Sequence, residues 1–211
     1  MLSDMVDKYS NFAELAANER VGVDFQIRVE MRGTPVAIIA PHGGCIDPGT
    51  AEIAATIAGD TQSFYAFEAL RPAGERGSLH ITSARFDEPQ ALALVGEAQK
   101  VVAIHGRADN GDPLTVGVGG RDIALRDEIV ATLRAAGFPA EILAQGRLAG
   151  RDLANICNRG ATGAGGQLEL PRTLRTQLTT DLERLGAFCS AVRRAAVAAE
   201  ESPGYLDESS T

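Results

Sequence analysis

The sequence has only three cysteines among its 211 residues, and their positions exclude two common kinds of architecture. Cys45, Cys157 and Cys189 cannot all pair within one chain. Their spacing also matches no zinc knuckle and no CxxC motif. We therefore expect neither a disulfide framework nor a cysteine-rich zinc module. A reduced protein of the cytoplasm is the simpler interpretation.

Other absences narrow the class of function. No apolar run is long enough to cross a membrane, and the first residues lack the basic and apolar segments of a signal peptide. We accordingly expect a cytoplasmic protein with no membrane contact, and favour a monomer. Acidic residues outnumber basic ones and give a net charge of -8, which argues against a nucleic-acid partner. This balance still allows a local basic pocket. Nearly all the basic residues are arginine.

What the chain does contain is an alternation of strand-like and helix-like segments without an internal repeat. Strands are expected at seven places: 23–31, 36–40, 63–70, 100–106, 114–120, 138–144 and 165–171. A further short extended piece is expected at 78–83. Helices are expected at four places: from near Pro48 to Gly59, over 88–99, over 121–137, and from Leu174 to Ala199. This alternation predicts an α/β sheet with helices on both faces. The acidic, polar residues 201–211 are expected to form a disordered tail.

Two of the apolar strands end in histidine, and this is the first functional signal. The segments "AIIAPH" and "VVAIH" deliver His42 and His105 to the carboxyl ends of their strands. Ligands of α/β sheets bind at that edge. A lone histidine is usually a polar residue with a satisfied hydrogen bond, but two at one sheet edge make a site plausible. The third histidine, His80, falls in the short extended piece.

Asp47 has two interpretations that do not exclude each other. Followed by Pro48, it fits the N-cap of a helix whose first residue is proline. Its carboxylate could also join two neutral imidazoles in a zinc site, a frequent set in hydrolases that leaves one position for water. Cys45 could act as a nucleophile or ligand, although a small buried cysteine is the commoner case.

A zinc hydrolase needs a separate base, and Glu169 is the best candidate. In "GQLELP", Gln167 and Glu169 share one face of the strand, and Leu168 and Leu170 share the other. A glutamate in such a strand is either a solvated edge residue or a functional acid, and these residues alone do not decide between them.

The glycine-rich region that follows "NICNRG" offers a possible anion site. Asn158 and Arg159 could bind an anionic group there, because arginine can hold a carboxylate with two hydrogen bonds. A polar loop with flexible glycines is the alternative interpretation.

Six motifs in this order resemble those of the phage-type poly-gamma-glutamate hydrolase family: "APHGGCIDPGT", "YAFEAL", "LHITSARFDEP", "AIHG", "NICNRG" and "GGQLELP". The resemblance covers residues 7–200, nearly the whole chain. It implies one compact domain like a zinc carboxypeptidase, with a mixed central sheet flanked by helices and a single zinc ion. The implied activity is hydrolysis of amide bonds, with gamma-glutamyl linkages as the expected substrate.

The resemblance also assigns roles to residues of this chain. It implies that His42, Asp47 and His105 bind zinc and that Glu169 is the catalytic base. His80 would lie beside the metal and position the substrate or stabilise the oxyanion. Asn158 and Arg159 become candidate contacts for a substrate carboxylate.

The family usually has glutamate where this chain has Asp47, so the shorter side chain must come closer to bind zinc, or serves only as a cap. An anionic polymer would also require a local arginine patch, for which four residues are candidates: Arg107, Arg121, Arg151 and Arg159. Two alternatives therefore stay open. One is a cysteine hydrolase that uses Cys45 with His42 or His80, and the other is a metal-free binding module on the same scaffold.

Overall fold

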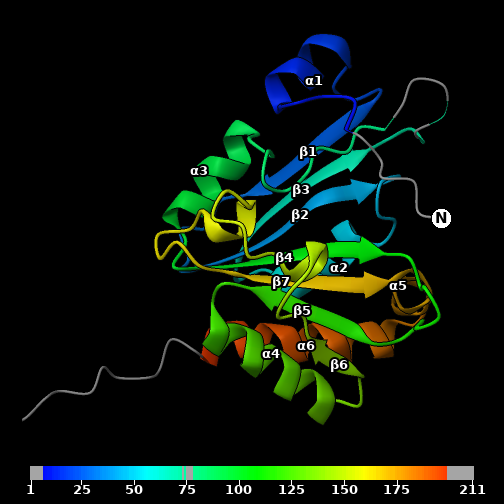
Figure 1. Cartoon of the computed structure of the whole chain (residues 1–211), viewed down its shortest axis with the longest axis vertical. Helices are drawn as coiled ribbons and strands as arrows, with labels where there is room; N and C mark the ends of the chain where they lie inside the picture. Colours follow the sequence, from blue (N-terminus) through cyan, green and yellow to red (C-terminus); the bar gives the residue numbers. More distant parts are fainter. Residues whose placement is uncertain (1–6, 73, 75–77, 199–211) are drawn as a thin grey trace, which may run out of the picture.

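The protein is an α/β structure built on one seven-stranded sheet, seen in a computed structural model that describes residues 7–72, 74 and 78–198 (Figure 1). The expected acidic tail at 201–211 lies outside these residues. The strands occupy seven ranges: β1 Phe25–Glu30, β2 Val36–Gly44, β3 Ser63–Ala69, β4 Lys100–Arg107, β5 Val116–Gly120, β6 Ala140–Ile142 and β7 Gly166–Pro171. Each was expected from the sequence, because each carries a run of buried apolar residues or an alternation of polar and apolar ones.

The sheet is mixed, in the order β1-β3-β2-β4-β7-β5-β6. The four central strands β3, β2, β4 and β7 run parallel, whereas β1 and β5 pair antiparallel with their inner neighbours. The carboxyl ends of β2, β4 and β7 therefore meet at one edge of the sheet. That edge receives His42, His105 and Glu169, as the sequence predicted for the two histidines.

Helices cover both faces of the sheet. They occupy six ranges: α1 Phe12–Asn18, α2 Thr50–Ala58, α3 Pro89–Glu97, α4 Ile123–Ala135, α5 Arg172–Thr180 and α6 Leu182–Ala198. Apolar residues of α2, α4, α5 and α6 form one core with the side chains of Ile38, Ile104 and Leu168. A second core on the other face joins α1 and α3 to Ile39 and Ala103. The alternation of neighbouring strand residues between the two cores is the period-two pattern of a sheet buried on both faces.

The single long helix expected from Leu174 to Ala199 is wrong, because the structure divides it at Asp181. Asp181 leaves the helical conformation (φ -124°, ψ 101°), and its Oδ1 accepts a hydrogen bond from the backbone N–H of Arg184 at 3.0 Å. An aspartate in this position caps the helix that follows. The apolar periodicity continues across the break, so it gave no sign of the division.

Two other local expectations differ from the structure. Residues 78–83, expected as a short extended piece, form a loop outside the sheet. Helix α1 was not predicted. Asn11 caps its start, since Oδ1 of Asn11 accepts a hydrogen bond from the backbone N–H of Glu14. The helix is short, and Leu15 is its only buried residue.

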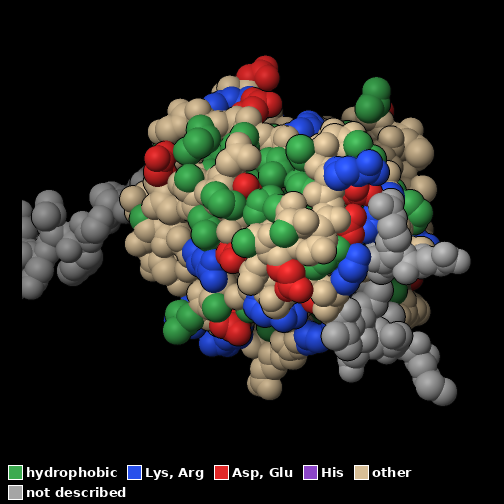
Figure 2. Space-filling model, turned by 90° about the horizontal axis from the view of Figure 1, so that it is seen from above, with side chains coloured by type: hydrophobic (Ala, Val, Ile, Leu, Met, Phe, Trp, Pro, Cys, Tyr) green, Lys and Arg blue, Asp and Glu red, His purple; other side chains and the backbone are tan. Residues whose placement is uncertain are grey.

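At the end of the molecule that carries α1 and β1, the described residues place charges of both signs side by side. Figure 2 looks onto this end and shows basic and acidic side chains close together around hydrophobic ones. Ion pairs here include Arg28 with Glu68 and Lys8 with Glu19. Within the described residues, none of the helices combines the length and apolar character needed to cross a membrane.

Candidate metal centre

A cavity of about 620 Å³ opens at the carboxyl ends of the parallel strands. The three candidate metal ligands and the two candidate catalytic residues all line it: His42, Asp47, His105, His80 and Glu169. They come from β2, the loop after it, the 78–83 loop, β4 and β7. The fold thus brings together residues that are up to 127 positions apart in the chain, which is the expected use of this edge of an α/β sheet.

His42 and His105 face each other across neighbouring strands, with their Nδ1 atoms 3.0 Å apart. Both side chains are buried. The Nε2 of His42 lies 2.8 Å from the carbonyl oxygen of Ile81, so this nitrogen carries the proton and donates it. The Nδ1 of His42 is therefore a lone pair directed at His105. A backbone carbonyl that fixes the tautomer in this way is typical of metal-binding histidines.

A bulge in β2 turns His42 toward this cavity. Ala40 pairs with Ala66 and Gly43 with Glu68, so β2 has one residue more than β3 over this stretch. Without the extra residue, alternation would put His42 on the same face as Ala40, which packs in the core with α2 and α6. A bulge that redirects a side chain is common beside active sites. The sequence placed His42 at the correct edge but gave no sign of the bulge.

Asp47 is directed at β4 and does not cap α2. Helix α2 has Gly49 (φ 93°) at its N-cap, and no side chain bonds to its first turn. The Oδ2 of Asp47 accepts a hydrogen bond from the backbone N–H of Gly106 at 3.0 Å, and this leaves Oδ1 for another partner. The interpretation of Asp47 as the cap of α2 is therefore wrong.

The donor atoms of His42, Asp47 and His105 all lie within 4.8 Å of one another. Because Nδ1 of His42 is a lone pair, Nδ1 of His105 is the donor between the two rings, and Nε2 of His105 is buried without a hydrogen-bond partner among the described residues. Burial lowers the pKa of His42 well below its usual value and that of His105 to about 3, so both rings are neutral. Two neutral imidazoles and a carboxylate are a donor set that fits zinc.

Glu169 lies beside this group, because it pairs in register with His105 on the adjacent strand. Its side chain is 3% exposed. Burial, together with the negative charge of Asp47, raises the pKa of Glu169 to about 8. The sequence left a solvated edge residue as the alternative, and this burial excludes it. The face that Glu169 shares with Gln167 is confirmed, because Leu168 and Leu170 pack in the opposite core.

One amide holds the carboxyl group of Glu169, and a second amide holds the first. Nε2 of Gln167 donates to Oε1 of Glu169 at 2.7 Å, and Nδ2 of Asn155 donates to Oε1 of Gln167 at 2.9 Å. Neither amide was predicted from the sequence to have a role. The only signal for Gln167 was its position two residues before Glu169, on the same face of the strand.

His80 occupies the wall of the cavity next to His42, with ring centroids 4.2 Å apart. Its Nδ1 lies 2.6 Å from Oδ1 of Asp7, and Oδ2 of Asp7 accepts from Thr82 N at 2.7 Å. Asp7 therefore fixes both the ring of His80 and the loop that carries it. Nothing in the sequence pointed to Asp7, which is 73 residues away.

Three arginines line the same cavity: Arg107, Arg147 and Arg151. Arg107 is largely held by its own loop, since its guanidinium donates to the carbonyl oxygens of Ala108, Asp109 and Thr115. Arg147 and Arg151 are exposed at the rim. The sequence had proposed Arg107 and Arg151 for a basic pocket, and the structure adds Arg147.

Asn158 and Arg159 do not line the cavity. Nδ2 of Asn158 donates to the carbonyl oxygens of Gly150 and Asp152, and its Oδ1 accepts from Gly165 N, so the buried amide holds the surrounding loops. Arg159 donates to the carbonyl oxygen of Phe86. Cys45 is exposed and also lies outside the cavity lining.

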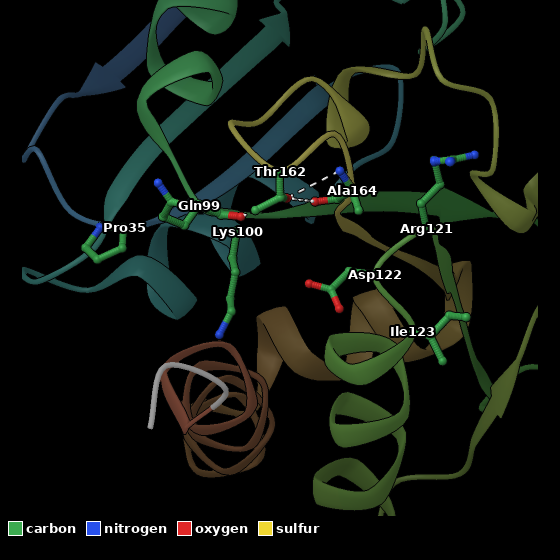
Figure 3. A pocket seen from close by; sticks show the side chains of 8 residues that line it. All are labelled: Pro35, Gln99, Lys100, Arg121, Asp122, Ile123, Thr162 and Ala164. Atoms are coloured by element: carbon green, nitrogen blue, oxygen red, sulfur yellow. Dashed lines mark hydrogen bonds between the residues drawn. The ribbon is translucent and has the colours of Figure 1, made fainter. Parts of the chain in front are cut away.

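A second depression, of about 810 Å³, lies at the opposite edge of the sheet. Figure 3 shows Gln99 and Lys100 on one side of it and Arg121 and Asp122 on the other. Lys100 begins β4, so this depression is at the amino end of the strand that delivers His105 at its other end. It contains no histidine and none of the predicted site residues except Arg121, which lies away from the group around His105.

Comparison with known proteins agrees with the resemblance. The family model for poly-gamma-glutamate hydrolase matches residues 9–191. Among curated relatives from Bacillus subtilis (strain 168), the SPbeta prophage-derived UPF0714 protein YoqZ is 42% identical over 173 residues, and UPF0714 protein YndL is 39% identical over 173 residues. These matches cover 82% of this chain, 61% of YoqZ and 67% of YndL. The chain therefore spans about two thirds of the length of these relatives.

Solved structures show the same fold. A bacteriophage poly-gamma-glutamate hydrolase superposes with a TM-score of 0.83 at 33% identity, covering 92% of this chain and 98% of that one. A zinc-free structure of YndL superposes with a TM-score of 0.82 at 35% identity, covering 90% of this chain and 97% of that one. The predicted mixed α/β fold of a single domain is thus confirmed.

Proposed function

The chain belongs to the poly-gamma-glutamate hydrolase family, and from this we propose that it is a zinc-dependent hydrolase that cleaves gamma-glutamyl amide bonds. The observation that carries the proposal is the grouping of His42, Asp47 and His105 beside a buried Glu169 in one cavity. The similar protein YndL has been solved in a zinc-free form, which supports zinc as the metal.

In this proposal His42, Asp47 and His105 hold the ion through Nδ1 of His42, a nitrogen of His105 and a carboxylate oxygen of Asp47. Zinc, when bound, polarises the scissile carbonyl and lowers the pKa of water toward neutrality. Glu169 accepts the proton of the attacking water and passes it to the leaving nitrogen. Gln167 keeps the carboxylate of Glu169 aimed into the cavity while this happens.

The remaining groups of the cavity bind the substrate. His80, held by Asp7, contacts the carbonyl oxygen and stabilises the charge that develops on it. Arg147 and Arg151 at the rim, with Arg107 deeper in, attract the free carboxylates that every residue of a gamma-linked glutamate polymer carries. A basic rim of this kind suits an anionic polymer even though the whole chain is acidic.

The first test is the metal content of the purified protein. We expect about one zinc per chain in wild type, its loss in His105→Ala, and its retention in His80→Ala, the matched control outside the ligand set. The loaded protein should release glutamyl fragments from poly-gamma-glutamate, stop when a chelator is added and resume with zinc. A wild-type protein that takes up no zinc on reconstitution would contradict the proposal.

The cysteine hydrolase is the competing reaction class. Cys45 is exposed and does not line the cavity that His42 and His80 line, so neither imidazole is placed to activate its thiol. Alkylation of Cys45 should therefore leave the activity unchanged. Inactivation by alkylation together with indifference to chelators would favour the cysteine mechanism.

A further inference from the structure

We propose that Arg175 is a positioning residue that ties together the three backbone segments carrying Asp47, His105 and Glu169. The inference rests on the proposed function, since it concerns the same metal centre. Arg175 belongs to α5 and does not line the cavity. Its side chain is 4% exposed, so the guanidinium is held beneath the site and out of solvent.

Each hydrogen bond of this guanidinium goes to a different segment. Nη1 donates to the carbonyl oxygen of Pro48 at 2.6 Å, one residue after Asp47. Nε donates to the carbonyl oxygen of Leu170 at 3.2 Å, one residue after Glu169. Nη2 lies 3.5 Å from the carbonyl oxygen of Arg107, two residues after His105. One planar group thus bonds immediately downstream of two candidate ligands and of the candidate base.

Gly106 makes this arrangement possible. A Cβ at this position would lie 2.5 Å from Cζ of Arg175, so only glycine lets the guanidinium pack flat against β4. The same residue donates its backbone N–H to Oδ2 of Asp47. Gly106 therefore contacts both residues: its backbone N–H bonds to Asp47, and Arg175 packs where a side chain would otherwise be.

Helix α5 is itself fixed to the same region. Thr173 donates its backbone N–H at 3.0 Å and its hydroxyl at 2.7 Å to the carboxylate of Asp109, which follows β4. These two hydrogen bonds fix the part of α5 from which Arg175 extends, independently of the three bonds that its guanidinium makes. Lysine could keep the positive charge, but its three N–H donors share one nitrogen, whereas Arg175 reaches these carbonyls from three separate nitrogens of a rigid plane.

The variants Arg175→Lys and Arg175→Met separate the effect of the planar guanidinium from the effect of its positive charge. Zinc affinity is measured on the full chain by competition with a chelator, and coordination geometry by the visible spectrum of the cobalt-substituted protein. We expect both variants to bind zinc at least about 10-fold more weakly, the usual effect of losing an outer-shell partner, and to change the cobalt spectrum. Gly106→Ala, which displaces the guanidinium from the other side, should have the same effect.

The matched control is Arg193→Met. Arg193 also donates to two backbone carbonyls, those of Thr56 and Ile57, but it joins α6 to α2 away from the cavity. Its loss should lower the melting temperature while leaving zinc affinity and the cobalt spectrum as in wild type. Wild-type affinity and spectrum in Arg175→Lys would overturn the positioning role alone. Failure of the wild type to bind either metal would contradict the proposed function instead, and the inference with it.

Discussion

At the scale of single residues, Glu169 combines properties that suit a base. It is buried, it accepts one amide hydrogen bond, and burial with the charge of Asp47 raises its pKa to about 8. A carboxyl group whose pKa is near the working pH can both accept and return a proton. A bound cation would draw the pKa downward and keep the group ionised when substrate arrives.

Replacing this residue should abolish turnover without removing the metal. We expect Glu169→Gln to lower kcat by about 10²–10⁴-fold, the usual contribution of a general base. Zinc content should stay at the wild-type level, because glutamine keeps the size of the side chain and its bond from Gln167. Glu141→Gln, an exposed strand residue on β6, is the control and should retain full activity. Zinc loss in Glu169→Gln would make Glu169 a ligand and not a base.

The same side chain should make the metal-free protein less stable as pH rises. The native pKa of about 8 exceeds the ordinary value of 4.5, so the native state binds the proton more tightly than the unfolded chain. Stability from this group is complete below pH 4.5 and is lost as pH rises toward 8. Glu169→Gln cannot lose stability in this way. Between pH 5 and pH 8 its free energy of unfolding should therefore rise relative to wild type by at least about 1.4 kcal/mol, the equivalent of one pKa unit.

Urea unfolding of both metal-free proteins between pH 5 and 9 measures this difference. The histidines contribute equally to the two proteins, so the comparison isolates Glu169. A constant difference between wild type and variant across this range would mean that Glu169 keeps an ordinary pKa.

At the scale of elements, the junction between α5 and α6 depends on one cap. Asp181 accepts from the backbone N–H of Arg184, so Asp181→Ala should lower the free energy of unfolding by about 1 kcal/mol. The effect is measured by denaturant unfolding, with Glu128→Ala on the exposed face of α4 as control. The junction lies outside the cavity, so zinc affinity should not change. An Asp181→Ala protein as stable as wild type would show that the cap contributes nothing.

The elements also show which parts of the structure could be predicted from the sequence. All seven strands were predictable because burial selects runs such as Val36–Ala40, and the parallel order put His42 and His105 at one edge. The bulge in β2 was not predictable, since it adds a residue without changing the apolar pattern. The break at Asp181 was hidden for the same reason, as apolar periodicity continues across it.

Contacts between distant residues were the other limit on prediction. The sequence identified residues whose chemistry is unusual for their place, such as Glu169 within an apolar strand. It could not identify Asp7 or Arg175, because an aspartate near the first helix and an arginine on a polar helix are ordinary in themselves. Their roles come only from the partners that the fold brings to them.

At the scale of the whole molecule, an acidic protein is proposed to act on an anionic polymer. The net charge of -8 repels such a substrate at long range, and the arginines of the cavity attract it at short range. Added salt weakens the long-range repulsion most. The rim arginines would touch a bound polymer directly, so we expect their attraction to dominate binding.

Removing the rim charges should therefore weaken substrate binding more than catalysis. We expect Arg147→Gln with Arg151→Gln to raise KM for poly-gamma-glutamate by about 10-fold or more, at roughly 0.7 kcal/mol or more for each lost charge-assisted bond. kcat should change little, because neither residue belongs to the group that holds zinc or moves the proton. The variant should also lose the part of the salt dependence of KM that comes from these two charges. Arg194→Gln, exposed on α6, is the control and should match wild type. An unchanged KM with a fallen kcat would instead assign the two arginines to the reacting bond.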